Sequence, residues 1–244
     1  ARPAAGAVCM RALLRGGIHL AVRTASRPRR AQRRSRVQVR AMGGPPLPKA
    51  PLGVSLGAAD GAVLEFYLDY CCPFSAKFYN TVVGQVAPLY ASKVKFVFQH
   101  QVQPWHPQST LMHEAAFAVR EIGGDDKFWA FSEALMAAQV EYFDVNVADK
   151  TRAQVGADLA ALAHKATGVP AADVAALLAL NPAAIREGQL NPGSGVTQQV
   201  KWSAKLSRER GIHVSPTTVF NGLICDTSSG WTVDQWKEWL DARI

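Results

Sequence analysis

The chain has 244 residues, of which 48% are hydrophobic, so it is long enough to bury a full core in one or two domains. Its formal net charge of +8 is unevenly distributed. Residues 1–50 contain 12 basic and no acidic residues, whereas the remaining 194 residues contain 15 basic and 19 acidic ones. The part predicted to fold is therefore mildly acidic, which argues against a nucleic-acid-binding surface on it.

Residues 1–50 are predicted to be a disordered organellar transit peptide. They are rich in Arg, Ala, Ser and Gly, lack acidic residues and end in a Pro-rich stretch at 43–48. Residues 37–42 resemble the cleavage region of plastid presequences, so we expect import into the chloroplast, with the mitochondrion as the alternative. A basic arm that binds RNA or lipid is a further alternative. No apolar run approaches the length of about 18 residues that a membrane span needs, so we expect no membrane-spanning helix.

A short stretch at residues 69–75, Asp-Tyr-Cys-Cys-Pro-Phe-Ser, is the predicted active site. It follows an apolar run at 62–68 that is typical of a buried strand. Proline is favoured at the first position of a helix. Pro73 is therefore expected to begin the helix, which puts Cys72 at the N-cap. At an N-cap the sulfur faces unpaired N–H groups and the positive end of the helix dipole, and both favour a thiolate. Cys72 is therefore the candidate nucleophile, and a pair of buried, unreactive cysteines is the alternative.

Ser75 stands where a second cysteine would complete a Cys-x-x-Cys pair. A disulfide oxidant passes its own disulfide to a substrate, and a reductase uses its second cysteine to leave the mixed disulfide. Neither step is available within this motif. We therefore predict monothiol exchange, in which Cys72 attacks a glutathionylated or disulfide substrate and an outside thiol such as glutathione resolves the adduct. Ser75 is expected to donate a hydrogen bond to the thiolate.

The other cysteines are not expected to resolve that adduct. The chain has four cysteines, with Cys9 in the predicted transit peptide, which is too few for a disulfide scaffold of the secreted kind. Cys71 and Cys72 are adjacent and close a disulfide only through a strained ring, so they are treated as separate thiols. Cys71 is interpreted as structural, and Cys225 is expected to lie out of disulfide reach beyond a hairpin turn.

The rest of the chain alternates between strand and helix patterns. A helix at 75–90 and a strand at 93–99 fit a parallel strand–helix–strand crossover. Asn221-Gly222 between apolar runs predicts a β-hairpin, and the last helix begins at a Thr232 capping box. The region between these two parts is helical, with predicted helices at 109–122, 125–139, 151–167, 171–180 and from about 196 to 210.

This order of motifs resembles the DsbA-like branch of the thioredoxin-fold superfamily over about residues 60–244. The resemblance implies an α/β, thioredoxin-like fold with an inserted helical domain. The thioredoxin-like domain is then split into 60–106 and 194–244, and the helical insertion occupies 107–193. No bound cofactor or metal is expected, and glutathione is a possible co-substrate.

The same resemblance assigns the site. Cys72 matches the attacking cysteine, and Pro216 matches a cis-proline opposite the active site. Ser75 departs from the family pattern, because most redox members have the resolving cysteine there; we take it as the second catalytic residue. The residues expected to contact thiol or disulfide substrates, either glutathione or an extended peptide added as a strand at Ser215, are Cys71, Pro73, Phe74, Ser215 and Pro216.

Two other functions remain open. Kappa-class glutathione transferases have a similar architecture and a Ser-Pro-Tyr-Ser type motif, although a cysteine at its first position fits thiol exchange better. A binding module that has lost turnover is the third possibility. Oligomeric state is not predicted.

Three histidines, His100, His106 and His113, lie close together in the sequence. A metal site needs further ligands at defined spacing, and none stands near enough in the sequence to propose one. We interpret them as polar loop histidines, with His106 or Trp105 as candidates for lining the groove beside Cys72.

Overall fold

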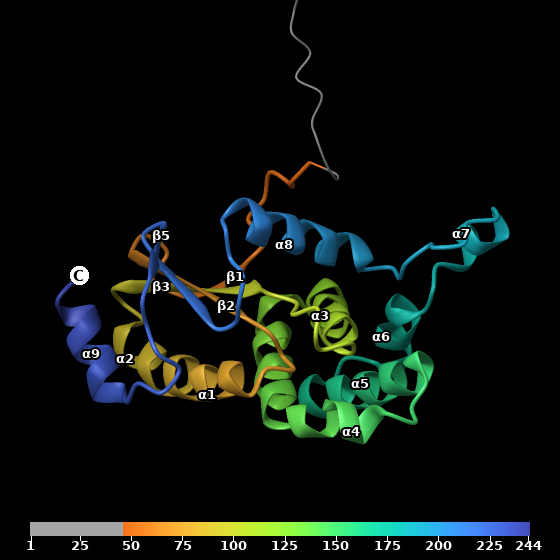
Figure 1. Ribbon diagram of the computed structural model, residues 1–244, viewed down its shortest axis with the longest axis horizontal. Coiled ribbons are helices and arrows are strands. Elements are labelled where there is room, and N and C mark those ends of the chain that lie inside the picture. The colour runs from red at the N-terminus through yellow and green to blue at the C-terminus, as the bar shows by residue number, and fades with distance from the viewer. Residues whose placement is uncertain (1–45) are drawn as a thin grey trace, which may run out of the picture. The chain divides into compact units, whose positions relative to one another are not determined.

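The computed structural model describes residues 46–244, and the predicted transit peptide lies almost entirely outside them. A mixed five-stranded sheet forms the centre of this part, in the order β1-β3-β2-β4-β5 (Figure 1). The two central strands β2 and β3 are parallel, and every other pair is antiparallel. The strands are β1 (Val54–Gly57), β2 (Ala62–Leu68), β3 (Val94–His100), β4 (Thr217–Phe220) and β5 (Leu223–Cys225).

The parallel crossover predicted from the sequence is confirmed. β2 has the predicted bounds, and its register with β3 pairs Leu68 with His100 at their carboxyl ends. The two loops that leave these ends therefore start side by side. This places the Asp69–Ser75 motif next to the segment that follows β3.

The helix predicted at 75–90 is continuous but not uniform. It consists of α1 (Pro73–Thr81), the π-helical turn η1 (Val82–Val86) and α2 (Ala87–Tyr90). Pro88 has no N–H to donate to the carbonyl of Gly84, so regular α-helical bonding cannot continue through this point. The wider turn before α2 absorbs the interruption.

The region between β3 and α8 (Thr197–Glu209) is helical. The predicted break at Gly123-Gly124 is confirmed as a kink inside the first helix, where Gly124 has φ 76°. The capping boxes predicted at Thr151 and Thr232 are both present. The elements are α3 (Ser109–Ala137), η2 (Gln139–Tyr142), α4 (Asp144–Val147), α5 (Arg152–Thr167), α6 (Ala171–Leu178) and α7 (Pro182–Arg186).

Four short elements, β1, η2, α4 and α7, were not predicted. Each has only four or five residues, too few for a hydrophobic period to show in the sequence. β1 forms because its backbone adds to the free edge of β3, antiparallel to it.

Helices cover both faces of the sheet. Figure 1 shows α1 and α9 (Val233–Asp241) on one side and α8 on the other. On the α1 side, Phe66 and Phe78 pack with ring centroids 5.7 Å apart, and Phe78 meets Trp236 of α9 at 5.5 Å. A smaller apolar cluster on the other side contains Tyr67 and Ile212. This double-sided packing fixes β2, and with it the position of Cys72.

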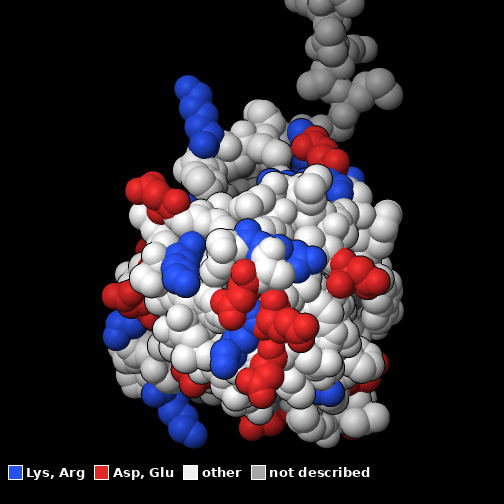
Figure 2. All heavy atoms as spheres, turned by 90° about the vertical axis from the view of Figure 1, so that its left-hand side faces the viewer, with Lys and Arg blue, Asp and Glu red and all other residues white. Residues whose placement is uncertain are grey.

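On the face turned to the viewer in Figure 2, Lys and Arg side chains are interspersed with Asp and Glu side chains. No large patch of one charge covers this face. Among residues 46–244, no helix combines the length and the apolar character needed to cross a bilayer.

Candidate functional site

Cys72 occupies the N-cap of α1, as the sequence predicts. Its backbone is extended, with φ −88° and ψ 121°, and its carbonyl accepts the N–H groups of Ser75 and Ala76 at 3.0 and 3.2 Å. Pro73 favours this geometry because a residue before proline is disfavoured in the helical region. The Cys72 thiol lies 3.5 Å from the carbonyl oxygen of Ser215 and donates a hydrogen bond to it.

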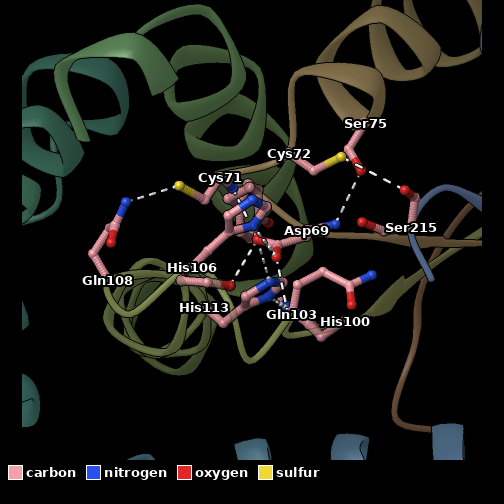
Figure 3. Close-up of polar contacts among 12 residues, drawn as sticks. Asp69, Cys71, Cys72, Ser75, His100, Gln103, His106, Gln108, His113 and Ser215 are labelled. Carbon is pink, nitrogen blue, oxygen red and sulfur yellow. Dashed lines mark hydrogen bonds and ion pairs between the residues drawn. The ribbon is translucent and has the colours of Figure 1, made fainter. Parts of the chain in front are cut away.

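The loop before β4 completes this side of the site. The Ser215–Pro216 peptide bond is cis, as predicted from the family resemblance. β4 pairs with β2, and Tyr67 lies opposite Thr217. Because Cys72 follows β2 closely and Ser215 precedes β4 closely, this pairing brings the two residues together from opposite ends of the chain (Figure 3).

Ser75 is fully buried, and its hydroxyl oxygen accepts the backbone N–H of Asp69 at 3.2 Å. A serine hydroxyl also carries one hydrogen to donate. Residues at the N-cap and three positions later face one another across the first helical turn. Ser75 therefore ties the start of α1 to the end of β2 while its own hydrogen remains available for donation.

Asp69 is a buried carboxylate that joins the motif to the segment after β3. Its Oδ1 accepts the N–H of Cys71 at 2.9 Å and the hydroxyl of Ser109 at 2.6 Å. Its Oδ2 accepts the N–H of Gln103 and Nδ1–H of His106, both at 3.0 Å. Together these bonds fix the Cys71 backbone against the loop that contains His106.

The Asp69 carboxylate is held in its charged form. Burial alone favours the neutral acid, but the His113 ring, the Ser109 hydroxyl and the Cys71 N–H stabilise the anion more strongly and lower the pKa of Asp69 to about 2. Nε2 of His113 lies 3.7 Å from Oδ1, so this contact is longer than the other bonds to the Asp69 carboxylate. A fixed negative charge therefore lies beneath the motif at neutral pH.

The interpretation of His100 and His113 as polar loop residues is wrong. His100 is the last residue of β3 and His113 lies in α3, and both are buried, with their Nδ1 atoms 2.7 Å apart. Burial, followed by the charges of His113 and Arg120, lowers the pKa of His100, so this ring is neutral. His100 continues the inward face of Phe96 and Phe98, and this alternation is the sequence signal that identifies it as buried.

Cys71 and Cys72 point in opposite directions (Figure 3). The Cys71 sulfur is buried and accepts a hydrogen bond from Nε2 of Gln108 at 3.1 Å. Burial and the charge of Asp69 raise the pKa of Cys71 to about 12, so it remains a thiol at neutral pH. Cys225 lies in β5, where its thiol donates to the carbonyl of Leu223.

A hollow of about 310 Å³ opens on the Cys71 side of the motif. His106 lines it, whereas Trp105, which is 58% exposed, does not; because Cys72 is not in the lining, this hollow is not the groove beside Cys72 for which the two residues were candidates. We call this feature the Asp144 hollow, and its lining residues are Cys71, Pro73, His106, Gln108, Phe143, Asp144 and Val145.

Exposed apolar side chains belong to three segments next to the site. Phe74 of the motif is 62% exposed, Trp105 of the loop after β3 is 58% exposed and Val214, just before Ser215, is 53% exposed. The bulk of Phe74 faces solvent although it adjoins the buried Cys72. Exposed apolar side chains of this kind are often found where a protein binds a partner.

Gln103 is a site residue that the sequence did not identify. Its side chain is 1% exposed, yet neither its amide nitrogen nor its amide oxygen has a hydrogen-bond partner among residues 46–244. The hydroxyl of Ser215 is also buried, and it has no partner in the described part of the chain. Buried polar groups are normally paired, so these atoms retain capacity to bond a substrate or a water molecule. Nothing in the local sequence marks Gln103, because its position depends on the long-range contact with Asp69.

Within the described residues, no group of three or more His, Cys, Asp or Glu side chains gathers in a way that holds a metal ion. The three histidines near the motif are instead bonded to Asp69 or to one another.

The sheet order, the helical insertion and the cis-proline beside an N-cap cysteine together define the architecture. The chain has a DsbA-like thioredoxin fold. No protein-family model matches its sequence, and no curated protein matches it in sequence either. Solved structures do match this DsbA-like fold, and they include thiol-disulfide oxidoreductases.

One such structure is a Pseudomonas syringae protein provisionally named a protein-disulfide isomerase. It is 26% identical, with a TM-score of 0.61, and the match covers 77% of this chain and 97% of that one. BdbD from Bacillus subtilis is 20% identical, with a TM-score of 0.60 and coverage of 80% and 95%. MdbA, a thiol-disulfide oxidoreductase from Actinomyces oris, is 18% identical, with a TM-score of 0.57 and coverage of 78% and 85%. This similarity is consistent with an oxidoreductase.

Proposed function

We propose that the protein catalyses thiol–disulfide exchange through the single thiol of Cys72, with an outside thiol such as glutathione completing the cycle. The observation that carries the proposal is the position of Cys72 at the N-cap of α1, beside the Ser215 carbonyl, with Ser75 in place of a second cysteine. The N-terminal end of a helix carries the positive end of its dipole, which favours an anionic group at this position.

The exchange proceeds in two balanced steps. The Cys72 thiolate attacks one sulfur of a substrate disulfide, forms a mixed disulfide and releases the other sulfur as a thiolate. A glutathione thiolate then attacks the substrate sulfur of this adduct, which carries the substrate away as a glutathione disulfide and returns the Cys72 thiolate. One disulfide is present before and after the two steps, so no further oxidant or reductant is needed. The Ser75 hydroxyl donates to the Cys72 sulfur each time it leaves as an anion.

The surroundings of Cys72 support a disulfide on an extended peptide as one substrate. The unpartnered hydroxyl of Ser215 and the amide of Gln103 offer polar contacts, and the exposed rings of Phe74 and Trp105 offer apolar ones. Pro216 turns the chain so that the segment before β4 borders the site. An extended substrate can pair with backbone groups there as an added strand.

The function is tested by turnover of a glutathionylated peptide in the presence of free glutathione. We expect release of the reduced peptide by the native protein and none by Cys72→Ser. Insulin reduction by dithiothreitol is expected to be weak, and Ser75→Cys, which restores a dithiol motif, is expected to raise it. Absence of peptide turnover together with an unmodified Cys72 overturns the proposal in favour of a binding module. Transfer of glutathione to an electrophile without disulfide exchange favours a kappa-like transferase.

We also propose import into a plastid, from the composition of residues 1–50. A fluorescent protein fused behind this segment is expected in chloroplasts. Accumulation in mitochondria supports the alternative organelle, and a diffuse signal outside both overturns the targeting proposal.

A further inference from the structure

The Asp144 hollow adjoins the motif but is not used by the exchange steps. Its walls include Cys71 and Pro73, the two sequence neighbours of Cys72. The Cys72 sulfur points away from Cys71 (Figure 3), so a substrate held at Cys72 reaches this hollow across Pro73. The volume of about 310 Å³ is near the lower end for ligand pockets and suits one long side chain.

The charge of the hollow is negative. The Asp144 carboxylate accepts one hydrogen bond, from Nε2 of Gln108 at 3.2 Å, and the lining contains no Lys or Arg. Among the ion pairs of the described residues, none includes Asp144. The lining has two further ionisable residues, Cys71 and His106, and the His106 ring is bonded to the buried Asp69 carboxylate. No positive side chain in the lining therefore neutralises Asp144.

The remaining walls are apolar. Pro73, Phe143 and Val145 line the hollow, and Val145 is 84% exposed at its rim. A long cationic side chain matches this combination, because its methylene stem covers apolar surface while its charged end reaches a carboxylate.

We propose that the Asp144 hollow binds an organic cation carried by the substrate, so that Cys72 reacts faster with disulfides that have a positive group close to the reacting sulfur. The inference rests on the proposed exchange function and deepens it. Two sources share this chemistry, which are a Lys or Arg side chain flanking a substrate cysteine and the α-ammonium group of glutathione. An ion pair at an accessible site supports a preference of about two- to fivefold.

The test uses cysteine peptides activated as mixed disulfides with thionitrobenzoate, whose release by Cys72 is coloured. The peptides differ at one position only, which lies one or two residues before or after the cysteine and carries Lys, Leu or Glu. For at least one of these four positions, we expect the second-order rate constant to be highest with Lys, intermediate with Leu and lowest with Glu. The corresponding mixed disulfides of glutathione and N-acetylglutathione test the second source.

Three variants assign any preference to the hollow. Asp144→Asn is expected to remove the dependence on charge, and Asp144→Lys to reverse it. Asp149→Asn makes the same charge change nearby on an exposed residue outside the lining and is expected to retain the native preference. Each result is the ratio of the rate constants of two peptides measured with the same variant. A change in the folded fraction of that variant therefore does not affect it.

The outcomes separate the two proposals. Release from every probe at rates independent of charge, or a preference that persists in Asp144→Asn, overturns the inference and leaves the exchange function intact. If none of the probes releases thionitrobenzoate, the exchange function itself is overturned. A preference for Lys peptides that disappears in Asp144→Asn supports a peptide cation, and a preference confined to glutathione over its acetylated form supports the small thiol.

Discussion

Cys71 and Cys72 are neighbours in the chain, but their sulfurs lie in different environments. Burial, followed by the charge of Asp69, raises the pKa of the Cys71 thiol to about 12, and the hydrogen bond from Gln108 only partly opposes this rise. Because the thiolate is the reactive form, Cys71 is expected to resist iodoacetamide at pH 8 in the native protein. Cys225, which is half-buried, is expected to react faster.

This first prediction is checked by mass mapping of alkylated peptides from native and urea-unfolded protein. Both cysteines react at similar rates once the chain is unfolded. Modification of Cys71 in the native protein as fast as Cys225 contradicts the assigned environment.

Asp69 carries a second prediction, about stability and pH. Its folded-state pKa is about 2, below the ordinary value of 3.8, so its ionised form stabilises the fold. This contribution is fully present above about pH 4 and is lost as the pH falls through 2. A shift of this size corresponds to roughly 2 kcal/mol of unfolding free energy.

Urea unfolding of the native protein and Asp69→Asn from pH 6 to pH 2 tests this contribution. The variant is expected to be less stable at pH 6, and the difference between the two proteins is expected to shrink as the pH falls. Asp158→Asn, at an exposed carboxylate paired with Lys150, is the control and is expected to have a small effect. A constant difference across this range contradicts the role given to the Asp69 charge.

At the scale of elements, the kink in α3 depends on one glycine. Gly124 has φ 76° and ψ −172°, a region that is essentially restricted to glycine. Gly124→Ala is therefore expected to reduce the unfolding free energy by about 1 to 3 kcal/mol. Gly84 in η1 has no close neighbour at its Cβ position and no positive φ, so Gly84→Ala is expected to be neutral or slightly stabilising. Equal effects of the two substitutions on urea unfolding are incompatible with a glycine-dependent kink.

Local sequence patterns predicted the elements that carry their own signals. The strand β2, the N-cap at Cys72 and the two capping boxes follow from residues within a few positions of one another. The edge strand β1 does not follow from such a local pattern, because it pairs with β3, about 40 positions away in the sequence. Gln103 escaped notice for the same reason, since its backbone bond to Asp69 spans 34 positions in the sequence.

The same distinction applies to the candidate site. The motif supplied Cys72 and Ser75, and the family resemblance supplied the cis-proline, Pro216. The Asp144 hollow required the folded chain, because its walls come from the motif, the loop after β3 and the segment around α4. Composition alone does not bring Asp144 next to Pro73.

For the molecule as a whole, the described fold begins close to the Pro-rich segment. Nη1 of Arg120 donates to the carbonyl of Leu52 at 3.1 Å, and β1 starts at Val54. A chain that begins at Pro51 keeps both contacts and is expected to melt within a few degrees of the full chain. A large loss of melting temperature contradicts the prediction that the removed segment is a transit peptide dispensable for folding.

Reaction with oxidised glutathione tests the central claim most directly. The native protein is expected to gain one glutathione on Cys72, measured as the mass of the intact protein and located by peptide mapping, and free glutathione is expected to remove it. The adduct is expected to persist in Cys71→Ser and Cys225→Ser and to be absent in Cys72→Ser. Failure of Cys72 to form the adduct, or an adduct that free glutathione leaves in place, contradicts monothiol exchange.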